Sequence, residues 1–300
     1  MDTTQEQRLL QLSIGITLLL GALGIVFGLI ARSDAIVFDG FYSFIDALMT
    51  VVSLAVARLL ARQDSRRFQF GFWHLEPAVI ALNGTLLLLA CLYAVLTSIG
   101  SLLSGGRAIA FGPGVLYAAL VAGAALIMAA VMRRKAARLQ SDLLRLDARG
   151  WLIGGVLSLA LLASFLSARL LTRIGYADYA PYADPLALAF LSLCVLPASL
   201  GPLSGAIREL LQIAPADLDR EVRTVMTEMQ ARHGFTGFTS YVAKVGRARF
   251  IEIHIVLPPA FAIGSIDELD QIRGAIAARL GEERPERWLS IVFTGEPAWT

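Results

Sequence analysis

The sequence predicts a membrane protein with a six-helix transmembrane bundle, followed by a small cytoplasmic α+β domain of ferredoxin-like type. Two observations carry this prediction. The chain of 300 residues is 56% hydrophobic and only 17% charged, whereas charged residues make up about a quarter of a soluble domain. The apolar residues also gather in runs long enough to cross a bilayer, which takes roughly 20 residues per helix. We therefore expect residues 1–210 to form the membrane domain and residues 211–300 to form a soluble domain that serves dimerisation.

Six apolar runs mark the expected transmembrane helices. They cover approximately residues 10–30, 35–60, 77–103, 113–132, 151–171 and 185–207. Three of the runs open on a proline, a residue that the first turn of a helix tolerates. An even number of helices places both ends of the bundle on the same side of the membrane.

After residue 207 the pattern changes to that of a soluble α+β domain. Apolar residues recur at helical spacing over residues 218–229, and apolar and polar residues alternate over 251–255 as in a strand. A second helix is expected within residues 265–281, and the stretch WLSIVF at 288–293 reads as the last strand. The order helix, strand, strand, helix, strand suits a sheet with its helices on one face.

Arginine and lysine residues set the expected orientation, because cytoplasmic loops carry an excess of both. Ten of them lie in or beside the second-to-third and fourth-to-fifth connections, against four in the other loops. The ten are Arg58, Arg62, Arg66, Arg67, Arg133, Arg134, Lys135, Arg138, Arg145 and Arg149, and the four are Arg32, Arg107, Arg169 and Arg173. We therefore expect a multi-pass protein of the cell membrane with both termini in the cytoplasm.

Several classes of function find no support in the sequence. No basic stripe interleaved with aromatic residues suggests nucleic acid as a partner. No G-x-S-x-G, H-E-x-x-H or phosphate-loop pattern suggests an enzyme. The two cysteines, Cys91 and Cys194, lie inside apolar runs and show no disulfide or zinc-finger spacing.

The stretch FDGFYSFID at residues 38–46 places two carboxylates, Asp39 and Asp46, inside an expected helix. Charged groups within a bilayer are costly and usually mark a functional site. Asp46 lies about 10 Å deeper than Asp39 along the helix, and it shares a helix face with Tyr42, four residues earlier. These properties favour a functional Asp46. Asp39 fits a site residue and an interfacial carboxylate near a helix N-terminus equally well.

Other polar residues lie at the expected membrane edges. Glu76 precedes Pro77 at the cytoplasmic mouth of the third helix, and His74 lies two residues earlier. A histidine and a glutamate can bind a divalent ion, although His74 also fits a hydrated interface. Asp184 opens the sixth helix from the outer side, either as a helix-start carboxylate or as a site residue.

The sequence as a whole resembles the cation diffusion facilitator family. Five features carry the resemblance: the six helices, the acid in the second helix, FGFWHLEP before the third helix, ADP at the start of the sixth, and the final α+β domain. The resemblance covers about residues 10–297. It implies export of a divalent metal such as zinc, manganese, iron, cobalt or cadmium from the cytoplasm, usually in exchange for protons and by a homodimer. The metal is the cargo, so no resident cofactor is implied.

The resemblance also implies a transport site formed by two residues four apart on the second helix and two on the fifth. The first pair falls on Tyr42 and Asp46. Aligning DARGWLIGGVLS by its tryptophan and serine puts Gly150 and Gly154 at the second pair, where they offer no side chain. In another register Asp147 faces the site, close to the cytoplasmic edge. An ion pair with a neighbouring arginine is the simpler explanation for Asp147.

We therefore expect Asp46 to be the central acid, with Asp39 and Asp184 on the outer path and Glu76 on the inner path. Such oxygen ligands favour a hard ion such as Mn²⁺ or Mg²⁺. In the soluble domain, His254 stands where the family places a regulatory metal ligand, and Glu296 falls near another such position. Ser265 and Thr294 stand where the family has histidines, which favours dimerisation over metal binding. The alternative function is a transport-dead membrane scaffold or metal sensor that retains the fold.

Overall fold

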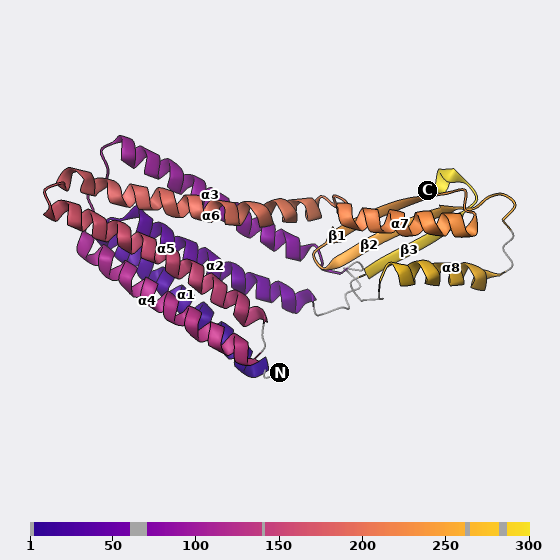
Figure 1. Ribbon diagram of the computed structural model, residues 1–300, viewed down its shortest axis with the longest axis horizontal. Helices are drawn as coiled ribbons and strands as arrows, with labels where there is room; N and C mark the ends of the chain where they lie inside the picture. Colours follow the sequence, from indigo (N-terminus) through magenta and orange to yellow (C-terminus); the bar gives the residue numbers. More distant parts are fainter. Residues whose placement is uncertain (1–2, 61–70, 140–141, 262–264, 282–286) are drawn as a thin grey trace. The chain divides into compact units, whose positions relative to one another are not determined.

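The computed structural model describes residues 3–60, 71–139, 142–261, 265–281 and 287–300 (Figure 1). Arg62, Arg66 and Arg67, three of the residues behind the predicted orientation, lie outside these ranges. The chain forms two compact units. One comprises Met1–Leu54 and Leu82–Leu203, and the other comprises Ala55–Ala81 and Ser204–Thr300.

Six helices of the described ranges are long and apolar enough to cross a membrane. They are α1 (Thr3–Ala31), α2 (Asp34–Leu60), α3 (Leu75–Leu103), α4 (Phe111–Leu139), α5 (Asp142–Arg173) and α6 (Ala183–Leu210), with a short helix η1 (Ala177–Tyr182) before α6. The predicted number and order are confirmed. The predicted bounds were too short, because polar residues continue a helix beyond its apolar stretch. This matters most for α5, which begins at Asp142 and therefore includes Asp147.

Small residues let α1 and α2 pack closely in the first unit. A Cβ atom on Gly24 of α1 would lie 2.6 Å from the α-carbon of Gly40 on α2 and 2.6 Å from the hydroxyl of Tyr117 on α4. Arrangements of this kind, in which glycine lets two backbones approach, are common between transmembrane helices. The close approach also brings Tyr117 beside Asp39, the residue that precedes Gly40.

The second unit contains the predicted α+β domain: α7 (Ala216–His233), β1 (Gly237–Val245), β2 (Ala248–Val256), α8 (Ile266–Arg279), β3 (Arg287–Thr294) and a short helix η2 (Pro297–Trp299). The sheet has the order β1-β2-β3, with β1 and β2 antiparallel and β2 and β3 parallel. Met226 of α7, Ile253 of β2 and Ile276 of α8 are fully buried in one core. Both helices therefore cover the same face of the sheet, as predicted.

Candidate cation site

A cavity of about 160 Å³ lies among α1, α2, α4, α5 and α6 in the first unit. Its volume equals that of about five water molecules in the liquid. We call it the acidic cavity, because three carboxylates line it. Its polar lining consists of Thr17, Asp39, Tyr42, Ser43, Asp46, Asp147, Trp151 and Ser158.

The predicted face of α2 opens onto this cavity. Asp39, Tyr42 and Asp46 all line it, as their spacing on one helix requires. Asp39 is partly fixed, because the hydroxyl of Tyr117 on α4 donates a hydrogen bond to its Oδ2 at 2.9 Å. The three side chains therefore face one compartment along about 10 Å of helix.

Asp147 of α5 is the third carboxylate of the acidic cavity. The buried hydroxyl of Ser13 on α1 donates to Asp147 Oδ1 at 3.0 Å, and Trp151 Nε1 donates to Ser13 Oγ at 2.7 Å. Asp147 Oδ2 is buried and has no hydrogen-bond partner within the described ranges. The sequence favoured an ion pair with a neighbouring arginine, whereas in the structure Asp147 bonds to Ser13 and lines the acidic cavity, as the other register would have it.

The two glycines that align with family ligands also line the acidic cavity. Gly150 and Gly154 belong to its wall, and a Cβ atom added to either would meet no neighbouring atom within 4 Å. The positions that the resemblance assigns to helix-five ligands therefore point at open space. Asp147, about one turn earlier on α5, carries the carboxylate that these positions lack.

The composition of the acidic cavity favours an oxygen-coordinated cation. Among the described residues that line it there is no lysine, arginine, histidine or cysteine, so no basic side chain of the described wall offsets the carboxylates. Oxygen ligands suit Mg²⁺ and Mn²⁺, whereas zinc sites usually include nitrogen or sulfur. Within the described ranges, no group of three or more His, Cys, Asp or Glu side chains converges closely enough to hold an ion. The carboxylates are thus distributed along the cavity, and a bound ion would keep part of its water shell.

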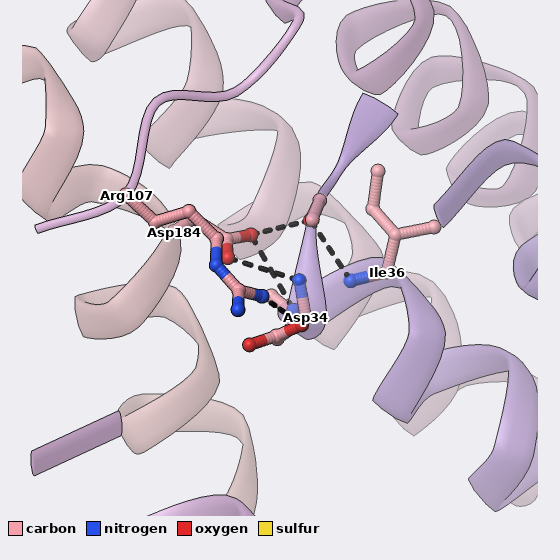
Figure 2. Close-up of polar contacts among 6 residues, drawn as sticks. Asp34, Ile36, Arg107 and Asp184 are labelled. Carbon is pink, nitrogen blue, oxygen red and sulfur yellow. Dashed lines mark hydrogen bonds and ion pairs between the residues drawn. The ribbon is translucent and has the colours of Figure 1, made fainter. Parts of the chain in front are cut away.

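Asp184 is buried, with 1% of its surface exposed, and it caps the start of α2 (Figure 2). Its carboxylate accepts hydrogen bonds from the hydroxyl of Ser33 and from the backbone nitrogens of Asp34, at 3.0 Å, and Ala35, at 3.4 Å. Ser33 Oγ in turn accepts from the nitrogen of Ile36 at 3.1 Å. Asp184 does not line the acidic cavity. These contacts favour the interpretation of Asp184 as a helix-start carboxylate. The helix whose start it caps is α2, not its own helix α6.

Glu76 belongs to the second unit, at the start of α3. Its Oε1 accepts a hydrogen bond from Arg247 Nε at 3.4 Å, and its Oε2 is buried without a hydrogen-bond partner in the described part of the chain. The side chain of His74 is exposed. Glu76 is therefore tied to the turn between β1 and β2 by a basic residue, and it keeps one carboxylate oxygen free of protein hydrogen bonds.

Both ring nitrogens of His254 contact other groups of the second unit. Nδ1 lies 2.9 Å from the carbonyl oxygen of Trp299, and Nε2 lies 3.0 Å from Glu252 Oε1. The ring also forms a T-shaped pair with the ring of Tyr241. His254 would have to give up one of these contacts to bind a metal.

The comparison with protein families agrees with this arrangement. Residues 10–211, more than half of the chain, match the cation efflux transmembrane domain. The chain therefore belongs to the cation efflux family, as its resemblance to the cation diffusion facilitators predicted, and its members are membrane transporters of cations. A comparison with curated proteins gave no match.

Proposed function

We propose that the protein exports a divalent cation across the cell membrane in exchange for protons, with the acidic cavity as its transport site. The observation that supports this proposal is the gathering of Asp39, Asp46 and Asp147 around one small cavity that is lined by no basic residue of the part of the chain that the structure describes. Carboxylates held together in this way favour the entry of a cation, and a divalent ion offsets more of their charge than a monovalent one.

Asp46 serves as the central ligand in this proposal. It lies deep on α2, and Tyr42, one turn earlier, lines the same cavity. Asp147 supplies the carboxylate from α5 in place of the two glycines. A carboxylate must lose its proton before it binds a metal ion, so metal and proton compete for the same oxygens. This competition provides the exchange, and rocking of the helices would expose the cavity first to the cytoplasm and then to the outside.

A hard ion such as Mn²⁺ or Mg²⁺ fits the acidic cavity better than zinc. Every charged or hydroxyl ligand that its wall offers is an oxygen, and the indole nitrogen of Trp151 is a donor already bonded to Ser13. Mg²⁺ in particular keeps several of its waters and uses one or two carboxylates. The distributed carboxylates of this cavity match that requirement.

The test is metal flux into proteoliposomes under an imposed pH gradient, with Zn²⁺, Mn²⁺, Fe²⁺, Co²⁺ and Mg²⁺ compared. We expect flux of Mn²⁺ or Mg²⁺ that the gradient drives, abolished in Asp46→Asn. The matched control is Asp178→Asn in η1, which removes an exposed carboxylate outside the cavity and should leave flux unchanged. Equal flux in wild type and Asp46→Asn would reject Asp46 as the central ligand.

A transport-dead scaffold or metal sensor is the second candidate function. The glycines at 150 and 154 and the lack of converging ligands among the described residues favour it. A sensor would bind the cation without flux. This candidate would therefore be supported if calorimetry on the purified protein detects binding of a cation while none of the five ions shows flux into proteoliposomes.

We also propose that the protein is a homodimer. The family resemblance suggests it, and the sheet of the second unit exposes Tyr241 by 54% and Val292 by 37% on the face away from α7 and α8. Light scattering on the protein in detergent gives the mass of the complex. A monomeric mass would reject this part of the proposal without affecting the transport site.

A further inference from the structure

A second hollow in the first unit is apolar and lies between α2 and α3. It has a volume of about 470 Å³, and we call it the α2–α3 groove. Its lining includes Val37, Phe41 and Ile45 of α2, Leu89 and Tyr93 of α3, and Leu188 of α6. Tyr93 is 72% exposed and Leu89 is 57% exposed. Large apolar side chains of a membrane helix that are this exposed face lipid or another membrane protein.

The α2–α3 groove has the length of one lipid leaflet. Its lining extends from Asp34 to Ile45 on α2 and from Thr97 back to Leu86 on α3. Each stretch spans about 16 Å at the helical rise of 1.5 Å per residue. The hydrocarbon core of a bilayer is about 30 Å thick, so one leaflet accounts for about 15 Å. The groove therefore runs from one end of the bundle to about the middle of the membrane.

The groove meets a basic pocket at the end of the bundle where α2 begins and α3 ends. This pocket has a volume of about 460 Å³ and shares Asp34 and Val37 with the groove. Arg32 and Arg107 line it, and Arg107 forms an ion pair with Asp34 (Figure 2). The residues that line the pocket, two arginines and one aspartate, carry one net positive charge, which matches the single negative charge of a phosphodiester. The carboxylate of Asp184 lies nearby, but it is buried against the start of α2 and does not line the pocket.

We propose that the basic pocket and the α2–α3 groove together bind one phospholipid. The phosphate lies between Arg32 and Arg107, and one acyl chain lies in the groove against Phe41 and Tyr93. A membrane-facing hollow with a charged end and an apolar body one leaflet long has the chemistry of a lipid molecule. A second protein helix would fill the apolar body, but it would not call for two arginines at the membrane edge.

The backbone of Arg32 makes a sharp test possible. Arg32 has φ +55°, the left-handed conformation that glycine adopts at no steric cost. The variant Arg32→Gly therefore suits the turn between α1 and α2 at least as well as arginine does, and it removes the side chain with its guanidinium group without straining the backbone. A change in lipid binding by this variant cannot be attributed to failure of the turn to form.

The experiment measures lipid binding to the purified full-length protein, stripped of lipid in detergent, by native mass spectrometry with added phosphatidylglycerol. We expect one tightly bound lipid per chain. Arg32→Gly and Arg107→Gln should each weaken binding about fivefold, since an arginine at the membrane surface contributes about that factor. Arg169→Gln, an exposed arginine of α5 outside the pocket, is the control and should bind as wild type does.

A second pair of variants tests the groove itself. Ala90→Phe places a ring among the groove-lining residues of α3 and should displace the acyl chain, whereas Leu96→Phe changes an exposed residue of α3 outside the groove and should not. Equal binding by both variants would overturn the proposed position of the chain.

Two partial ligands test whether binding needs both the phosphate and the acyl chains. A diacylglycerol with the same chains lacks the phosphate, and glycerol phosphate lacks the chains. We expect both to bind more weakly than phosphatidylglycerol. Diacylglycerol binding as tightly would show that the arginines play no part, and glycerol phosphate binding as tightly would show a simple anion site. Disulfide cross-linking of two copies through Tyr93→Cys in proteoliposomes would show that a second copy fills the groove. Each of these results would overturn the lipid proposal.

Discussion

Ser13 of α1 donates a hydrogen bond to Asp147 of α5, with 3.0 Å between Ser13 Oγ and Asp147 Oδ1. Ser13 also accepts the indole hydrogen of Trp151 at 2.7 Å. A hydroxyl that accepts one hydrogen still has its own to donate, so the three residues form a directed chain that ends on the carboxylate. The chain fixes one oxygen of Asp147, and Oδ2 is left without a hydrogen-bond partner in the described part of the chain; in the proposed transport site, this is the oxygen that would bind the cation.

Ser13→Ala should weaken cation binding without abolishing transport. A hydrogen bond to a charged group is worth about 1.5–3 kcal/mol, so the KM for the transported ion should rise by about tenfold or more while Vmax changes little. Asp147→Asn, which removes the charge, should have the larger effect. Ser167→Ala, on an exposed part of α5, is the control. A fall in Vmax with unchanged KM would indicate that Ser13 only supports the packing of α1.

Gly150→His together with Gly154→Asp should shift the protein toward zinc. A Cβ atom at either position meets nothing within 4 Å, so both side chains have room in the acidic cavity. With Asp46 they would supply one nitrogen and two carboxylate ligands, a set suited to Zn²⁺. We expect zinc binding at least about tenfold tighter by calorimetry. The matched control, alanine at both positions, fills the same space without ligands and should leave zinc binding as it is in the wild type.

Asp184→Ala should destabilise the protein and leave the chemistry of transport intact. The substitution leaves the hydroxyl of Ser33 and the nitrogens of Asp34 and Ala35 without their acceptor, and each buried donor without a partner costs about 1–3 kcal/mol. We expect a clear drop in the thermal unfolding midpoint but an unchanged KM for the folded fraction. A raised KM at unchanged stability would instead support the predicted place of Asp184 on the outer path.

The parts of the fold that depend on local pattern could be predicted from the sequence. Six apolar runs define six helices because each must span the same hydrocarbon thickness. Likewise Tyr42 and Asp46 could be placed on one face of α2, because residues four apart in a helix lie on the same face. The alternation around Ile253 identified the core face of β2 in the same way.

Asp147 and Asp184 show where such prediction stops. The partner of Asp147 is Ser13, 134 residues earlier, and Asp184 caps a helix that begins at Asp34, 150 residues earlier. No periodicity within a segment indicates which distant helix will lie beside it. The local signal near Asp147, several arginines, pointed to an ion pair, whereas in the folded chain Ser13 of α1 bonds to this carboxylate at the wall of the cavity.

The stability of the second unit should depend on pH through His233. Its ring stacks on Phe235 with 5.5 Å between the ring centres, and its buried Nε2 has no hydrogen-bond partner in the described part of the chain. Burial, together with the neighbouring charge of Arg232, lowers the pKa of His233 below its ordinary 6.5. The folded protein thus favours neutral His233. Above pH 6.5 the stability contribution is complete, and as the pH falls from 6.5 toward the lowered pKa the unfolded chain takes up a proton that the folded one does not, so stability is lost.

His233→Phe keeps an aromatic ring against Phe235 and removes the titration. We therefore expect the unfolding midpoint of the full-length variant to fall less steeply than that of the wild type between about pH 7 and pH 5, a range that starts above the ordinary histidine pKa of about 6.5 and ends below it. Arg232→Gln should lie between the two, since it removes only the second cause of the lowered pKa. The same slope in wild type and His233→Phe would show that other groups govern the acid sensitivity of this unit.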